Sequence, residues 1–147
     1  MTVLEVIGSR SEVYSINDSA TVHDAARYLR EKQVRSVGVL DASGGLIGVV
    51  SQSDISDKVA AENKCPAWMR VSEIMSTGLV TVGPDRLVVD CLRLMEQNGI
   101  YHLLVVDANG SYRGMLSVTD LLRVIASDEK ARADMLEAFL FDRTSAR

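Results

Sequence analysis

The sequence of 147 residues has little cysteine, few aromatic residues and no long apolar run, and each shortage excludes a class of protein. Its two cysteines are too few for a disulfide framework and do not form the Cys-x-x-Cys pair of zinc or redox sites. No stretch reaches the roughly 18 apolar residues of a membrane-spanning helix, and the start of the chain lacks the pattern of a secretory signal. We therefore expect a protein of the reducing cytoplasm with no membrane partner.

Positive charge is also in short supply. The chain carries 16 Lys and Arg against 20 Asp and Glu, a net charge of −4. Because contacts to phosphates of nucleic acid need a basic surface, this balance argues against a nucleic-acid partner. Aromatic residues make up 5% of the chain and hydrophobic residues 47%, so the core is expected to be mainly aliphatic. The length suits one domain, or two small repeats that share a core.

The sequence contains an internal repeat. Residues 13–55 align without a gap with residues 79–121, a shift of 66 positions (79 − 13). Many of the remaining aligned positions keep their apolar character, which indicates a tandem duplication. Identical pairs include Asp24/Asp90, Arg27/Arg93, Val39/Val105, Asp41/Asp107, Gly44/Gly110, Gly48/Gly114, Ser51/Ser117 and Asp54/Asp120.

Each copy predicts the same order of elements, β-α-β-β-α. A short extended run and a turn precede a helix whose apolar residues recur at i, i+3, i+4 and i+7. In the first copy, Thr21 and Asp24 predict a capping box at the start of this helix. A hairpin follows, marked in the second copy by Asn109-Gly110, and a second helix then opens near Ser51 or Ser117. Strands are expected at 13–16, 34–40 and 46–50 in the first copy, and at 79–82, 100–106 and 112–116 in the second.

Two further segments connect and follow the copies. Residues 56–78 are expected to extend the second helix, to break at Pro66 and to add one turn near 71–75. Residues 128–143 predict a charged helix with an apolar stripe that packs either on the domain or on a partner chain. The stripe consists of Met135, Leu136, Phe139 and Leu140. The predicted division is repeat 1 at 1–64, repeat 2 at 65–127, and a C-terminal helix and tail at 128–147.

The copies end in G-V-V-S-Q-S-D-I and G-M-L-S-V-T-D-L, and V-S-E-I-M-S precedes the second. With these motifs the chain resembles, over roughly residues 3–125, a pair of CBS domains, named after cystathionine β-synthase. The resemblance implies an α+β fold of two repeats packed about a pseudo-two-fold axis, with facing sheets and flanking terminal helices. It also implies a stand-alone pair, or Bateman module, which commonly forms a homodimer.

In function, the resemblance implies a sensor and not an enzyme. Modules of this family bind AMP, ADP, ATP, NAD or S-adenosylmethionine in clefts between the repeats and pass occupancy to a partner protein, whose identity the chain does not reveal. No catalytic residue, catalytic cofactor or metal is expected. The alternative is a structural pair that holds a dimer or docks a partner without a small ligand. Retention of both Asp54 and Asp120 favours the sensor.

The two Ser-x-x-Asp segments allow two interpretations that can coexist. As a capping box, Ser51 with Asp54, and Ser117 with Asp120, satisfy free backbone donors at a helix start. As a ligand site, the helix N-terminus attracts phosphate and the carboxylate accepts bonds from ribose hydroxyls. By resemblance, Asp54 and Asp120 bind ribose. The same resemblance implies that a further four residues face ribose or phosphate: Ser51, Ser53, Ser117 and Thr119.

The remaining candidates surround these segments. The family pattern points to Tyr14, Val34, Val80 and Ile100 for adenine, although core packing explains the three aliphatic residues equally well. Where many members carry a basic pair, this chain has Arg35-Ser36 and Tyr101-His102. Arg35 suits phosphate, and His102 becomes cationic at low pH. So few cations favour AMP, ADP or NAD over ATP.

Three single residues complete the expectations. Gly38 stands where the family usually has proline, and either lets a backbone or a ligand approach closely or is filler beside packed side chains. Cys91 falls on the apolar face of a helix and is expected in the core. Cys65 precedes Pro66 and is expected to be exposed.

Overall fold

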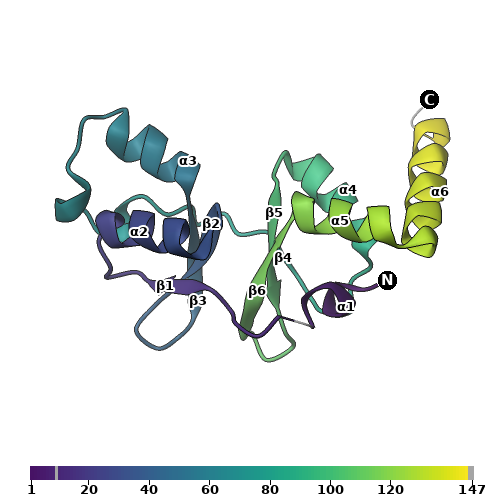
Figure 1. Cartoon of the computed structure of the whole chain (residues 1–147), viewed down its shortest axis with the longest axis horizontal. Helices are drawn as coiled ribbons and strands as arrows, with labels where there is room; N and C mark the ends of the chain where they lie inside the picture. Colours follow the sequence, from purple (N-terminus) through teal and green to yellow (C-terminus); the bar gives the residue numbers. More distant parts are fainter. Residues whose placement is uncertain (9, 146–147) are drawn as a thin grey trace.

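The computed structural model of the chain describes residues 1–8 and 10–145, and for 141–145 the course of the backbone. Two three-stranded sheets have the strand orders β1-β2-β3 and β4-β5-β6. In each, the first two strands are parallel and the last two antiparallel. The sheets lie side by side at the centre, with helices on their outer sides (Figure 1). The predicted α+β class and tandem β-α-β-β-α order are confirmed.

The elements of the two repeats correspond one to one. The first repeat comprises β1 (Ser15–Asn17), α2 (Val22–Lys32), β2 (Ser36–Leu40), β3 (Leu46–Ser51) and α3 (Gln52–Ile55). The second comprises β4 (Thr81–Val82), α4 (Val88–Asn98), β5 (His102–Val106), β6 (Tyr112–Ser117) and α5 (Val118–Ser127). β2 and β5 begin two residues later than predicted, because a left-handed residue, Gln33 or Gly99, first ends the preceding helix.

The helices follow the predicted apolar spacing. Val22, Ala25 and Leu29 of α2 are buried, as are Val88, Cys91 and Met95 of α4. Helix α2 also has the predicted capping box, since the backbone N–H of Asp24 donates to Thr21 Oγ1 at 3.1 Å. Apolar periodicity therefore explains both helices, and the capping box supports α2 alone, since Leu87 at the start of α4 makes no side-chain cap bond.

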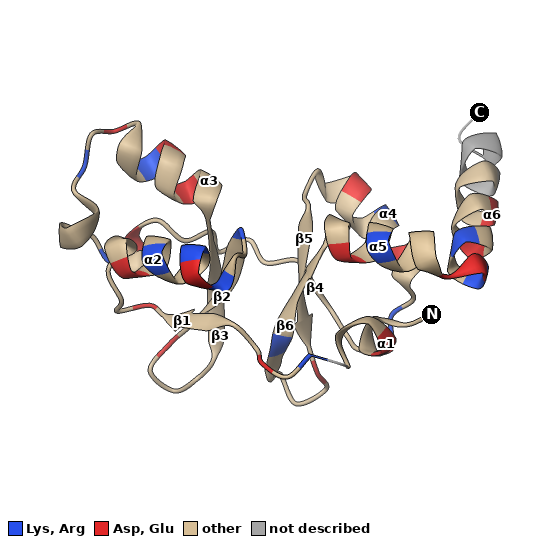
Figure 2. Cartoon of the chain, viewed as in Figure 1, with Lys and Arg blue, Asp and Glu red and all other residues tan. Residues whose placement is uncertain are grey.

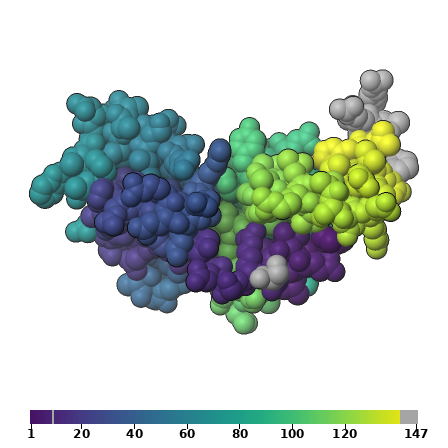
Figure 3. All heavy atoms as spheres, in the orientation of Figure 1, coloured from purple at the N-terminus to yellow at the C-terminus, as the bar shows by residue number. Residues whose placement is uncertain are grey.

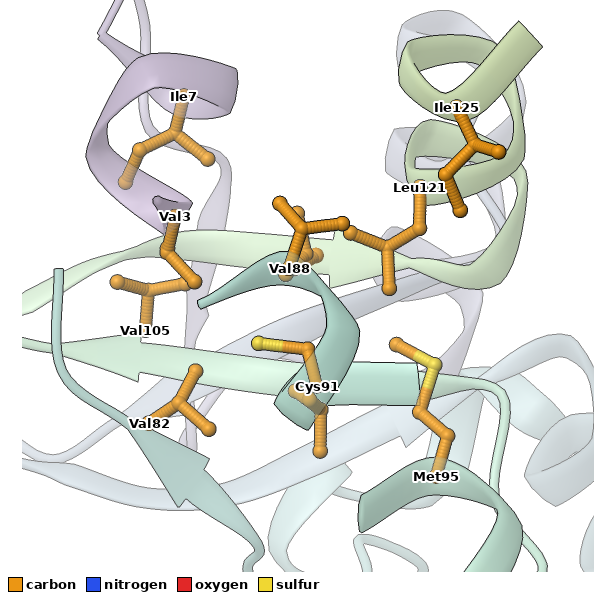
Figure 4. Close-up of a cluster of buried hydrophobic side chains, with 11 residues drawn as sticks. Val3, Ile7, Val82, Val88, Cys91, Met95, Val105, Leu121 and Ile125 are labelled. Atoms are coloured by element: carbon orange, nitrogen blue, oxygen red, sulfur yellow. The ribbon is translucent and has the colours of Figure 1, made fainter. Parts of the chain in front are cut away.

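Each repeat completes its core with a segment from outside its own β-α-β-β-α unit. Helix α1 (Val3–Ile7) packs Val3 and Ile7 into the core of the second repeat (Figure 4). The 3₁₀ turn η3 (Val71–Glu73) and Ile74 join the core of the first repeat. The sequence V-L-E-V-I at 3–7 parallels V-S-E-I-M at 71–75, a similarity that the 66-residue shift does not show because the offset here is 68 (71 − 3). The two repeats are thereby interlocked.

The connection between the repeats differs from expectation. After α3 the chain forms a π-helical turn, η1 (Ser56–Ala60), and Asn63 then takes a left-handed φ of 52°. The helix therefore ends before Pro66, so the expectation that Pro66 breaks it is wrong. Pro66 instead begins the 3₁₀ turn η2 (Pro66–Trp68), a position that suits proline because the first helical N–H has no partner. Cys65 is exposed, as predicted.

The C-terminal helix α6 (Glu129–Ser145) packs against α4 and α5. Its predicted apolar stripe is divided between two surfaces. Met135 and Phe139 are half-buried, whereas Leu136 and Leu140 are 55% and 66% exposed. None of the helices within 1–8 and 10–145 has the length and apolar character needed to span a membrane.

The two sheets approach closely at Gly38. A Cβ atom on this glycine would lie 2.7 Å from Cζ of Tyr112, so the tyrosine ring occupies the space of the missing side chain. Of the two interpretations of Gly38, the position beside a packed side chain is therefore the one the structure shows, because a tyrosine ring and not a backbone segment fills the space. The space-filling view shows the first and second repeats in contact along this boundary, with the N-terminal segment reaching onto the second (Figure 3).

Candidate ligand-binding clefts

Both Ser-x-x-Asp segments form capping boxes. Ser51 begins α3, where its Oγ accepts from the N–H of Asp54 at 3.2 Å and its own N–H donates to Asp54 Oδ2 at 2.9 Å. Ser117 begins α5 with the same pair of bonds to Asp120, at 3.1 and 2.9 Å. The capping interpretation is confirmed, and it fixes both carboxylates at the junction of a strand and a helix.

Strand pairing brings the capping serines next to other predicted residues. Ser36 pairs with Ser51, and His102 pairs with Ser117. Side chains of directly opposite residues share one face of a sheet, and neighbours along a strand point to opposite faces. Because Val37 and Leu103 lie in the helix-covered cores, the Ser36–Ser51 and His102–Ser117 pairs belong to the faces on which the two sheets meet.

Asp54 is held entirely by its own repeat and the connection that follows it. The residue is 8% exposed. Its Oδ2 accepts from Ser51 Oγ at 3.0 Å, and its Oδ1 lies 3.0 Å from Lys58 Nζ and 3.4 Å from Ser76 Oγ. Lys58 also donates to the carbonyl of Ile74 at 2.8 Å. The first carboxylate is therefore buried within a local polar network.

Asp120 is held by a residue from the far end of the chain. Arg10 Nη2 lies 2.9 Å from Asp120 Oδ2, and Arg10 Nη1 donates to the carbonyl of Met115. Arg123 Nη1 is 3.9 Å from Oδ1. Sequence reasoning missed Arg10, since a separation of 110 residues leaves no local pattern. The signal available was the parallel between 3–7 and 71–75, which places the residues after each segment near equivalent strands.

The meeting faces of the sheets contain two buried hydroxyls without a hydrogen-bond partner in the described part of the chain, Ser36 Oγ and Tyr112 OH. Ser36 is 4% exposed. An unpaired buried hydroxyl carries a desolvation cost of about 1–3 kcal/mol and calls for an explanation, such as a ligand or water. Burial also raises the pKa of Tyr112 to about 12.

The repeats also meet electrostatically at His102. Burial lowers the pKa of His102, the nearby carboxylate of Asp120 raises it, and the Arg35 guanidinium of the other repeat lowers it. Arg35 and His102, which stood apart in the sequence, thus influence one another. Figure 2 shows Lys and Arg positions mixed with Asp and Glu positions along the helices of both repeats.

The other predicted residues are exposed, packed partly against the cores, or placed in contacts that do not involve Asp54 or Asp120. Arg35, Ser53 and Thr119 are exposed, while Val34 and Val80 pack partly against the cores. Tyr14 stacks edge-on with Tyr28, with ring centroids 6.4 Å apart, and lies 5.3 Å from the ammonium of Lys32. A groove of about 370 Å³ near Ile100 and Tyr101 runs between α4, α5 and α6 and does not include Asp120.

No group of three or more His, Cys, Asp or Glu side chains suited to a metal occurs among the described residues. Cys91 is buried, as predicted for a core residue, and burial raises its pKa to about 11. The polar groups that the structure brings together are therefore hydroxyls, carboxylates, one imidazole, one lysine ammonium and arginines.

The chain is similar to known proteins in sequence and in fold. A family model described as "CBS domain" matches residues 3–61 and 71–127. Protein MJ1232 of Methanocaldococcus jannaschii is 30% identical over 115 residues, a match that covers 78% of this chain and 37% of the relative. The homoserine O-acetyltransferase of Methanococcoides burtonii is 31% identical over 78% of this chain and 22% of the enzyme. The chain thus spans well under half the length of these two curated relatives.

Solved structures share the fold over nearly their whole length. A protein with CBS domains from Burkholderia ambifaria has a TM-score of 0.80 and 26% identity, covering 87% of this chain and 96% of its own. A CBS domain protein from Pyrobaculum aerophilum, complexed with AMP, has a TM-score of 0.80 and 20% identity, covering 93% and 99%. The CBS domain pair of protein MJ0100, in complex with 5-methylthioadenosine and S-adenosyl-L-methionine, has a TM-score of 0.77 and 22% identity, covering 86% and 97%.

Proposed function

The chain belongs to the CBS domain family, and from this premise we propose that it is a regulatory module that binds an adenosine-containing ligand between its two repeats. Occupancy would shift the conformation or assembly of the module, with no covalent chemistry. The fold neighbours solved with AMP and with S-adenosyl-L-methionine support this class of ligand. Ser36 carries the proposal, because its hydroxyl is buried, unpaired in the described structure and on the same sheet face as Ser51.

The polar groups fit the parts of a nucleoside phosphate. A carboxylate at the start of a helix accepts bonds from ribose hydroxyls, and the helix N-terminus attracts the phosphate. We call the proposed site at Ser36, Ser51 and Asp54 the first cleft, and the one at His102, Ser117 and Asp120 the second cleft. The Ser36 hydroxyl offers a further bond at the first cleft, where a ligand would remove its desolvation cost. We assign ribose to Asp54 and Asp120 and place Arg35 at the phosphate.

We further propose that AMP, ADP or NAD binds better than ATP. Arg35 is exposed, and burial lowers the pKa of His102, which disfavours its charged form. Lys58 and Arg10 are already paired with the carboxylates of Asp54 and Asp120. A triphosphate would therefore find too little compensating positive charge.

Thermal unfolding with AMP, ADP, ATP, NAD and S-adenosylmethionine tests the proposal. A ligand at 100 times its Kd stabilises the folded state by about 2.7 kcal/mol, which moves Tm by several degrees for a domain of this size. Asp54→Ala and Asp120→Ala should each reduce the shift. Asp24→Ala is the matched control, because Asp24 has the same capping role on α2 and lies outside the meeting faces. Absence of any shift, or full shifts in both cleft variants, would contradict the proposal.

The second candidate function is a structural pair that joins copies or partners without a ligand. The exposed Leu136 and Leu140 on α6 favour it. Light scattering of the full chain with and without AMP distinguishes the two: a constant dimer with no thermal shift supports the structural role.

A further inference from the structure

Arg10 performs in the second repeat the two contacts that Ser76 makes in the first. The backbone N–H of Ser76 donates to the carbonyl of Val49 at 2.8 Å, and its hydroxyl lies 3.4 Å from Asp54 Oδ1. Met115 and Asp120 are the counterparts of Val49 and Asp54, each 66 positions later (115 − 49; 120 − 54). Both receive their bonds from the Arg10 guanidinium. We call these two bonds the Arg10 bridge.

The replacement of the Ser76 hydroxyl by the Arg10 guanidinium changes the chemistry around the carboxylate. A serine hydroxyl is neutral and rotates freely, whereas a guanidinium is charged and presents a planar fork of donors that suits a carboxylate. Asp120 Oδ2 already accepts from the N–H of Ser117 at 2.9 Å, so the Arg10 contact at 2.9 Å fills this oxygen. A ribose diol that bonds to both carboxylate oxygens therefore has to displace Arg10.

The two carboxylates also differ in the element of the fold that supplies their cation. At the first cleft Lys58 contacts Asp54 from the same helical segment, four residues on, and its other bond, to the carbonyl of Ile74, stays within the core of the first repeat. Its displacement therefore leaves the N-terminal segment in place. Arg10 instead follows α1, and the N–H of Arg10 donates to the carbonyl of Ile7 at 3.0 Å. Since α1 is packed on the second core, release of the bridge loosens the N-terminal segment where it crosses β6.

We propose that Arg10 competes with ribose for Asp120 and so couples occupancy of the second cleft to the docking of the N-terminal segment. The inference rests on the proposed function and deepens it. The second cleft is then the weaker site, because only the fraction of molecules with an open bridge binds. A ligand at the first cleft leaves the bridge closed.

The test measures binding of adenosine and AMP by calorimetry in the Asp54→Ala background, which isolates the second cleft. Arg10→Ala should bind both about fivefold more tightly, as expected when a partly exposed ion pair no longer competes. Arg113→Ala is the matched control, since Arg113 lies on β6, the strand that Arg10 contacts at Met115, but pairs with Asp107 at 3.7 Å. Equal or weaker binding by Arg10→Ala overturns the proposal, and a selective loss of AMP would assign Arg10 to the phosphate instead.

Hydrogen exchange of the full chain gives the second readout. Amides of residues 3–8 and 10–14 should exchange faster when AMP is added to the wild type, and be equally fast with and without AMP in Arg10→Ala. Arg10→Gln, which keeps a hydrogen-bond donor but no charge, should fall between them. Binding without any change in exchange overturns the coupling. If neither the wild type nor any variant binds an adenosine compound, the proposed function fails, and the inference fails with it.

Discussion

The first repeat completes its core with part of the connection between the repeats, whereas the second completes its core with α1, a short helix that precedes the first repeat in the sequence. Ile74 lies between the two repeats in sequence, while Ile7 lies in this helix of five residues. The meeting faces differ in the same way. Ser36 and Gly38 of the first repeat correspond to His102 and Leu104 of the second, each 66 positions later.

The cores of the two repeats have diverged much less. Val37, Val39 and Val50 correspond to Leu103, Val105 and Leu116, and all six are almost fully buried. Core positions tolerate only residues of similar volume and polarity, while positions that face a ligand or a second sheet can specialise. The difference teaches that the meeting faces of the two repeats are not equivalent, and the following changes test that conclusion.

The largest effect is expected from truncating the segments that complete the cores. Ile74→Ala should reduce the free energy of unfolding by about 3 kcal/mol, because a buried isoleucine leaves a cavity. Ile7→Ala should cost less, since α1 can undock locally without unfolding the remainder. Chemical denaturation measures both. Equal losses would show that α1 is as firmly held as the connection and would contradict the comparison.

Gly38→Ala should cost about 1–3 kcal/mol, because its methyl group would overlap the Tyr112 ring. Adding Tyr112→Leu, which introduces the residue found at the equivalent position 46, should restore most of the loss. Gly83→Ala is the matched control, since a Cβ atom there would meet nothing within 4 Å and the φ of Gly83 is not positive. Thermal unfolding of the three variants would refute close packing if Gly38→Ala behaved like the control.

Loss of a capping serine should cost about 1 kcal/mol in either repeat. We expect Ser51→Ala to cost more than Ser117→Ala, because Ser51 Oγ also donates to Asp54 Oδ2 at 3.0 Å. Ser127→Ala, at the other end of α5, should have almost no effect. Denaturant midpoints decide the order, and a larger loss for Ser117→Ala would reverse the assigned asymmetry.

The smallest effect concerns pH and belongs to the second repeat alone. Burial lowers the folded-state pKa of His102 below 6.5, so the unfolded chain binds a proton more readily. The stability that this histidine contributes is present above pH 6.5 and is lost as the pH falls through the folded-state pKa. Tm measured from pH 8 to pH 5 should fall less in His102→Asn than in the wild type. His23→Asn, on the exposed face of α2, should keep the wild-type slope.

Much of the fold was predictable because its signals are local. The apolar spacing and Thr21–Asp24 cap predicted α2, and the aligned turns predicted both hairpins. The end of the first repeat's second helix was not predictable from Pro66, because a π-helical turn and the left-handed Asn63 end it earlier. The stripe on α6 was divided because α4 and α5 cover only the side that carries Met135 and Phe139.

For the candidate site, the local sequence pattern predicted the capping boxes and nothing further that the structure tests. Ser51, Asp54, Ser117 and Asp120 follow from a motif of four residues, and the structure shows their capping bonds. The roles of these residues toward a ligand stay predictions. Arg10 could not be found in this way, because its partners lie more than 100 residues away and depend on how α1 docks.

The sequence by itself therefore determined that the length of 147 residues holds two β-α-β-β-α units with aliphatic cores and a Ser-x-x-Asp segment after each hairpin. Periodicity, capping and duplication are written in neighbouring residues, so they can be read without coordinates. Only the tertiary structure decided which segment completes which core, which faces meet and which cation reaches each carboxylate. Those outcomes depend on packing between distant segments, and the contrast between Ser76 at Asp54 and Arg10 at Asp120 is their clearest result.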